Sequence, residues 1–147
     1  MRYVKNLLIG LMLTGFLMGF AQASDDKPFA EKKIVLQISD SDPFKQTLVL
    51  NVANNLLKEY GPDKVAIEIV AFGPGVRLMF ADNTNTGRIK SLDTSGVKFT
   101  ACSNTIKNMA KTLGEKPNIN AVASTNSPGI VRIAKLVTED GYILVKP

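Results

Sequence analysis

Cys102 offers the most distinctive chemistry in this 147-residue sequence, because it is the only cysteine. The chain contains no histidine and no tryptophan. These absences exclude a Ser-His-Asp triad, a Cys-His pair, an imidazole general base and a zinc site that uses histidine. Covalent or acid–base chemistry therefore has to come from Cys102, the carboxylates or the lysines.

The position of Cys102 favours a reactive thiol. An apolar run ends at Ala101 and an amphipathic stretch begins at Ser103, so the thiol falls between a predicted strand and a predicted helix. Ligands bind at this carboxyl edge of open α/β sheets, and the N–H groups and dipole of the following helix favour the thiolate. Two alternatives stay open: an intermolecular disulfide, and a small buried side chain that fills space under the helix.

Polar and glycine-rich segments follow other predicted strands. Asp40 and Asp42 come after the first strand and are candidates for contact with a ligand or a metal, but we favour a helix-capping role. The Gly73-Pro74-Gly75 turn follows the second strand and offers N–H groups to an anion, although any tight turn uses these residues. Ser127-Pro128-Gly129 is a second such helix start, for which a plain cap is the preferred interpretation. We expect no metal and no cofactor.

Strand-like and helix-like segments alternate along the chain. Buried parallel strands appear as continuous apolar runs, whereas surface helices repeat apolar residues every three or four positions. The alternation predicts a single α/β domain with a mostly parallel sheet flanked by helices. Strands are expected at 34–38, 65–72, 97–101 and 142–145, a strand or loop at 119–123, and helices at 44–60, around 89–92, at 103–113 and between Pro128 and Gly141.

Three of the predicted helices carry an apolar face that is expected to pack on the sheet. The first helix repeats an apolar residue every fourth position at Phe44, Leu48, Val52, Leu56 and Tyr60, with Val49, Ala53 and Leu57 beside them. The faces of the two later helices are Ile106, Met109, Ala110 and Leu113, and Ile130, Ile133, Ala134 and Val137.

The first 23 residues predict a secretory signal peptide. Arg2 and Lys5 precede the apolar stretch from Leu7 to Phe20, and Ala21-Gln22-Ala23 supplies small residues for cleavage. The stretch is short for a membrane span, and an uncleaved anchor is the alternative. We expect residues 1–23 to be a signal peptide, 24–32 a linker and 33–147 the domain, in a periplasmic or secreted protein.

The charge pattern gives little support to nucleic-acid binding. Eighteen basic and thirteen acidic residues leave a net charge of +5. The basic residues are scattered and are not interleaved with aromatic residues, whereas nucleic-acid-binding surfaces cluster their cations on one face. A solvated surface is therefore the expected role for all of them, Arg132 included. Stable membrane insertion is not expected after cleavage.

Four segments together resemble the DsrE/DsrF-like family, in its small exported branch. Its most specific element is the Ala-Cys-x-Asn-Thr sequence at 101–105, between a strand and a helix. The resemblance implies a DsrE-type (YchN-like) α/β fold, homo-oligomers such as trimers or hexamers, and a cysteine that carries sulfur as a persulfide. Cys102 matches that cysteine in position. The segments are Lys33–Ile38, Ala71–Val76, Val97–Thr105 and Gly141–Pro147.

Two functions from different classes follow. The first is a periplasmic sulfur-handling protein in which Cys102 takes sulfane sulfur from a donor and passes it to an acceptor, neither of which the sequence identifies. The second is a non-catalytic homo-oligomeric module that binds a small molecule. A thiol-disulfide oxidoreductase is disfavoured because the chain has no resolving cysteine. In the binding module, the pocket would be lined by Gly73, Gly75, Cys102, Ser103, Asn104 and Thr105.

Overall fold

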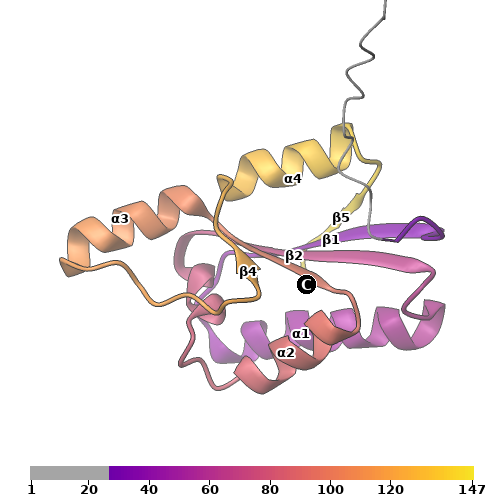
Figure 1. The fold of residues 1–147 in the computed structure, drawn as a ribbon, viewed down its shortest axis with the longest axis horizontal. Coiled ribbons are helices and arrows are strands. Elements are labelled where there is room, and N and C mark those ends of the chain that lie inside the picture. The colour runs from indigo at the N-terminus through magenta and orange to yellow at the C-terminus, as the bar shows by residue number, and fades with distance from the viewer. Residues whose placement is uncertain (1–26) are drawn as a thin grey trace, which may run out of the picture.

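The structure is a computed structural model that describes residues 27–147, so the predicted signal peptide and the start of the predicted linker lie outside it. Five strands form one sheet in the order β4-β3-β2-β1-β5, and all neighbouring pairs are parallel (Figure 1). The predicted single α/β domain is confirmed. The elements are β1 (Lys32–Ile38), α1 (Pro43–Tyr60), β2 (Val65–Ala71), the 3₁₀ helix η1 (Gly73–Met79), α2 (Thr86–Thr94), β3 (Lys98–Ala101), α3 (Ser103–Leu113), β4 (Ala123–Ser124), α4 (Gly129–Thr138) and β5 (Ile143–Val145).

The central strand β2 is buried on both faces along its whole length. It pairs with β1 from Val65 opposite Lys32 to Ala71 opposite Ile38. A continuous apolar run is what such a position requires, and Glu68 is its single charged residue. Because the strands are parallel, the carboxyl ends of β1, β2 and β3 meet at one edge of the sheet, and Cys102 follows β3 at that edge.

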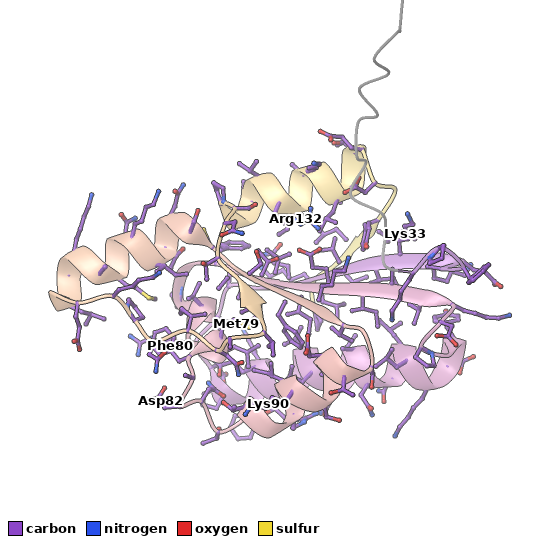
Figure 2. All side chains as sticks on the ribbon, in the orientation of Figure 1. Lys33, Met79, Phe80, Asp82, Lys90 and Arg132 are labelled. Atoms are coloured by element: carbon purple, nitrogen blue, oxygen red, sulfur yellow. The ribbon has the colours of Figure 1, made fainter. Side chains whose placement is uncertain are left out.

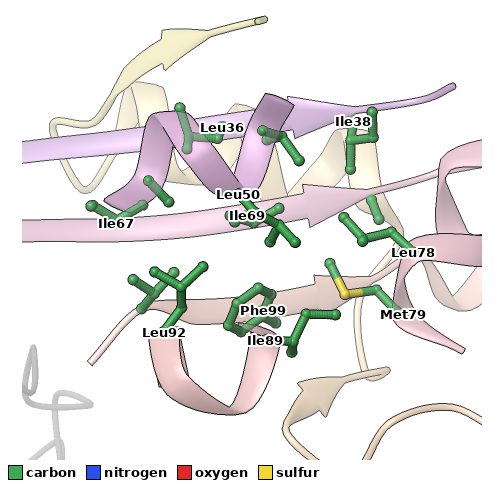
Figure 3. Close-up of a cluster of buried hydrophobic side chains, with 14 of the residues drawn as sticks. Leu36, Ile38, Leu50, Ile67, Ile69, Leu78, Met79, Ile89, Leu92 and Phe99 are labelled. Atoms are coloured by element: carbon green, nitrogen blue, oxygen red, sulfur yellow. The ribbon is translucent and has the colours of Figure 1, made fainter. Parts of the chain in front are cut away.

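The larger hydrophobic core lies between one face of the sheet and the helices α1 and α2 (Figure 3). Strand residues, both helices and η1 all contribute to this core, which joins residues between Ile34 and Ile106 into one packed layer. Its labelled members are Leu36, Ile38, Leu50, Ile67, Ile69, Leu78, Met79, Ile89, Leu92 and Phe99.

The apolar face predicted for α1 is wrong at its ends. Phe44 is 86% exposed and Leu48 is 44% exposed. A row spaced strictly four residues apart drifts by about 40° at each step around a helix of 3.6 residues per turn, so it leaves the side that faces the sheet. The buried residues of α1 are Gln46, Val49, Leu50, Ala53 and Leu57.

The faces predicted for α3 and α4 need a similar correction. Within α3 only Ile106 is buried, and Leu113 is 62% exposed, because the helix extends beyond the edge of the sheet (Figure 1). Helix α4 covers the sheet face opposite α1 through Ile133 and Leu136, whereas Ile130 is exposed. Its partners in this smaller core are Val35, Ala66, Val70 and Tyr142.

Several element boundaries differ slightly from the prediction. Strand β2 ends at Ala71, β3 begins at Lys98, and β5 begins at Ile143. In the ambiguous segment 119–123, Ile119 makes an isolated antiparallel bridge with Phe80, and strand β4 begins at Ala123. No helix within residues 27–147 has the length and apolar character needed to cross a membrane.

Candidate functional site

Cys102 occupies the N-cap position of α3, directly after β3. Its backbone N–H donates to the carbonyl oxygen of Ala71 at 2.9 Å, and its carbonyl oxygen accepts from the N–H of Ile106 at 3.0 Å. The first bond continues the pairing of β3 with β2, and the second is the first bond of the helix. Hydrogen bonds therefore hold the backbone of Cys102 through both its N–H and its carbonyl group, which fixes the position of its Cα atom.

The N-terminus of α4 packs directly against Cys102. A Cβ atom added to Gly129 would lie 3.2 Å from Cys102 Cβ and 2.9 Å from Phe72 Cβ. The N–H of Ser103 also donates to the carbonyl oxygen of Ser127 at 3.0 Å, which joins the starts of α3 and α4. Glycine at position 129 thus lets a second helix N-terminus reach the thiol. The preferred interpretation of Ser127-Pro128-Gly129 as a plain cap is wrong, because no side chain caps α4 and Pro128 holds the N-cap position.

Thr105 connects the thiol to the turn after β2. Its Oγ1 accepts a hydrogen bond from the N–H of Gly73 at 3.0 Å. The Thr105 side chain also forms a hydrogen bond with the Cys102 thiol, which lowers the pKa of that thiol. The glycine turn therefore acts on Cys102 through Thr105.

The surroundings of the sulfur favour the thiolate. Burial alone would raise the pKa of the Cys102 thiol, but hydrogen bonds from the Thr105 hydroxyl and from the N–H groups of Gly129, Thr105 and Asn104 outweigh it. The pKa is consequently lower than its ordinary value of 9.0. Hydrogen bonds to the charged form of an acid always act in this direction.

Cys102 is also buried, with 6% of its surface exposed. A buried cysteine in apolar surroundings has a raised pKa and is inert. At Cys102 the donors at two helix starts reverse the usual effect of burial. The site therefore combines low exposure with a stabilised thiolate, a combination that occurs at functional sites more often than at structural cysteines.

The predicted binding residues do not all lie together. Gly73 and Thr105 contact each other beside Cys102, and the Asn104 N–H reaches the sulfur. The Ser103 N–H is engaged by Ser127. Gly75 is buried against the end of β1, where a side chain would collide with the Ile38 carbonyl group. Gly75 thus serves close backbone packing, and the Gly73 N–H is not free for an anion.

The capping role favoured for the two aspartates after β1 is confirmed for Asp42 and is wrong for Asp40, because the N–H group that Asp40 accepts from belongs to Asp42, which precedes the first helical residue. Asp42 Oδ1 accepts from the N–H of Phe44 at 2.8 Å at the start of α1. Asp40 accepts from the N–H of Asp42 and forms an ion pair with Lys45 at 2.6 Å. Within residues 27–147 no cluster of acidic or sulfur ligands suitable for a metal ion is present.

One group of polar residues was missed by the sequence analysis. Glu68, on β2, is 2% exposed and accepts hydrogen bonds from Arg132 on α4 and Thr100 on β3. Arg132 was placed with the scattered surface cations. The available signal was a lone glutamate inside the Val65–Ala71 run, because a charge buried in a central strand requires a partner.

Comparison with known proteins finds a solved structure of similar fold whose function is not known. No protein-family model matches the chain, and no curated protein matches it. Among solved structures, it is similar to MTH1491 from Methanobacterium thermoautotrophicum, described as a protein of unknown function, with a TM-score of 0.70 and 26% sequence identity. The match covers 80% of this chain and 100% of that one.

Proposed function

We propose that this protein is a periplasmic sulfur-handling protein that carries sulfane sulfur as a persulfide on Cys102. The observation that carries the proposal is the convergence of four hydrogen-bond donors on one thiol, which lowers its pKa despite burial. A thiolate is the form of cysteine that attacks sulfur. The resemblance to the DsrE/DsrF-like family supports the same assignment.

The loading step is a displacement at sulfur. With thiosulfate as donor, the Cys102 thiolate attacks the outer sulfur, the S–S bond of thiosulfate breaks, and sulfite leaves with the bonding electron pair. The product is the persulfide anion Cys102–S–S⁻, so no external oxidant or reductant is needed. In the transfer step an acceptor thiolate attacks the terminal sulfur, takes it as a persulfide and releases the Cys102 thiolate.

The donors around Cys102 suit both ends of this cycle. The N–H groups of Asn104, Thr105 and Gly129 stabilise the thiolate that leaves in the transfer step, and a thiol of lower pKa leaves faster. Because the chain has a single cysteine, no intramolecular disulfide can form and discharge the sulfur. These features favour a carrier over a dithiol oxidoreductase.

Mass spectrometry of the folded protein after exposure to thiosulfate or polysulfide tests the proposal. We expect a mass increase of whole sulfur atoms that maps to Cys102 and is reversed by a small thiol acceptor. Cys102→Ser is the matched control, since serine is a preferred N-cap residue and preserves the start of α3. An unmodified thiol in native protein would support the binding module instead.

Self-association is the second part of the proposal. The residues of β5 are all exposed, and β5 lies at the edge of the sheet. Ile143 is 63% exposed there, and Ile130 on α4 is 59% exposed. Exposed apolar side chains on an edge strand are typical of association surfaces.

A further inference from the structure

A second polar site lies on the face of the sheet that α4 covers only in part. A pocket of about 390 Å³ opens over β3, between β4, the loop that precedes α4, and α4 itself. Its walls include Glu68, Lys98, Thr100, Ser127 and Arg132. Cys102 is not among its lining residues. The size is within the range of pockets that hold small molecules.

The Glu68–Arg132 pair forms the floor of this pocket. Arg132 Nε donates to Glu68 Oε1 at 2.8 Å and Arg132 Nη2 donates to Glu68 Oε2 at 2.6 Å, so the contact is bidentate. The Thr100 hydroxyl donates to Glu68 Oε1 at 2.7 Å. Figure 2 shows Arg132 on the side of α4 that faces the sheet. The guanidinium plane is thereby fixed before any ligand arrives.

Arg132 still has donors to offer. A guanidinium group has five N–H donors, and the two bonds to Glu68 use one on Nε and one on Nη2. Within residues 27–147 the remaining donors have no protein acceptor, and the Arg132 side chain is 28% exposed. They border the pocket, where an acceptor from solution can reach them.

The formal charges that line the pocket balance, with Arg132 and Lys98 set against Glu68 and Asp93. Glu68 is neutralised by Arg132, and Lys98 adds a second cation to the wall. The opposing charge belongs to Asp93, which is exposed on the rim and therefore screened by water. Ser127 and Asn126 supply hydroxyl and amide groups beside the cations. The planar edge of a guanidinium group matches the two oxygens of a carboxylate group.

We propose that this pocket binds a small carboxylate-bearing molecule, held by the outward N–H groups of Arg132, with Lys98 in the same wall. The buried Glu68 acts as a positioning residue that presents the guanidinium edge to the ligand. Stability alone does not explain a buried ion pair well, because replacing such a pair with apolar side chains of similar volume often leaves the protein equally stable or more stable. Its place in the floor of an open polar pocket gives the pair a binding role that is independent of Cys102.

A titration with malate, followed by ¹⁵N–¹H NMR of the full mature chain, tests this inference. We expect saturable shifts confined to the signals of Ser124, Ser127 and the first turns of α4. The double variant Glu68→Gln/Arg132→Met removes the cation without leaving a buried charge, and should weaken binding at least tenfold. Arg77→Gln, which removes an exposed arginine of η1, is the matched control and should bind as the wild type does.

Two further outcomes decide the matter. Lys98→Met leaves the Glu68–Arg132 pair intact and should weaken binding several-fold, which keeps the test valid if the double variant does not fold. Cys102→Ser should bind malate normally whether or not the wild type loads sulfur. The inference is overturned if the wild type shows no saturable shifts up to about 50 mM malate, well above the millimolar limit of weak specific binding. Equal affinity in folded wild type and double variant would also overturn it.

Discussion

Cys102 differs from a packing cysteine through the polar groups that reach its sulfur. Ala71 and Ile106 fix its backbone, while Thr105 and Gly129 direct donors at the side chain. Removing one of these donors changes the acidity of the thiol without changing its burial. The pKa of Cys102 is therefore the property that separates a functional role from simple space filling.

The pH dependence of alkylation tests this separation. In native protein, the rate of reaction with iodoacetamide should reach half its maximum at a pH below 9.0, because the thiolate reacts and its pKa is lowered by hydrogen bonds. Thr105→Val removes the hydroxyl donor and should move the midpoint to higher pH. Only the midpoint is diagnostic, since burial slows the reaction at every pH.

Thr112→Val is the control on the same helix. The Thr112 hydroxyl donates back to the Asn108 carbonyl oxygen, and the residue is exposed near the end of α3. Its replacement should leave the midpoint where the wild type has it. A wild-type midpoint at or above 9.0, or one that Thr105→Val does not move, would count against a stabilised thiolate.

At the scale of elements, the packing of α1 shows that the buried face is not the most regular apolar row. Leu50 is fully buried in the core, whereas Leu48 on the preceding half-turn is 44% exposed. Both are leucines in the middle of one helix. They form a matched pair for measuring which side of α1 stabilises the fold.

Leu50→Ala should lower the free energy of unfolding by about 2–5 kcal/mol, because it removes buried methyl groups and leaves a cavity. Leu48→Ala should change it by less than about 1 kcal/mol, since alanine loses little contact there and favours helix. Urea denaturation of both variants checks the difference. Equal costs, or a larger cost at Leu48, would contradict the packing described for α1.

The ion pair between Glu68 on β2 and Arg132 on α4 leads to a second prediction at the scale of elements, which concerns stability. Arg132→Met leaves Glu68 buried without its charged partner and should lower the free energy of unfolding by about 3–5 kcal/mol. The double variant Glu68→Gln/Arg132→Met should recover most of this loss, because no buried charge remains. Thermal unfolding of the two variants at neutral pH measures the difference. A double variant no more stable than Arg132→Met would show that the pair does not act as a unit.

At the scale of the whole molecule, the sheet formed by residues 27–147 ends at β5, whose residues are all exposed. Light scattering at micromolar concentration should give a mass above that of the monomer for the wild type, since this edge combines unpaired backbone with exposed apolar side chains. Ile143→Lys should shift the mass towards the monomer. Thr138→Lys adds the same charge at an exposed polar site on α4 and should leave the mass unchanged. A monomeric wild type would remove the self-association proposal.

The sequence by itself determined the class of fold and the location of the thiol. Continuous apolar runs at β1 and β2 require burial on both faces, and their alternation with helices leaves a parallel sheet as the solution. The sequence placed Cys102 at the carboxyl edge of the sheet, because the strand pattern ends at Ala101 and the helix pattern begins at Ser103. Each of these properties depends on residues that are close in sequence.

Tertiary structure alone decided which groups meet. The Gly129 N–H reaches Cys102 from 27 positions further along the chain, and Arg132 reaches Glu68 across 64. The lone glutamate of β2 signals that a partner exists, but no local pattern identifies the partner of Glu68 or of Cys102, because each contact depends on how α4 crosses the sheet. The buried sides of α1 and α4 were also decided by tertiary structure. Each helix has apolar residues on more than one side, and only the side that packs against the sheet is buried.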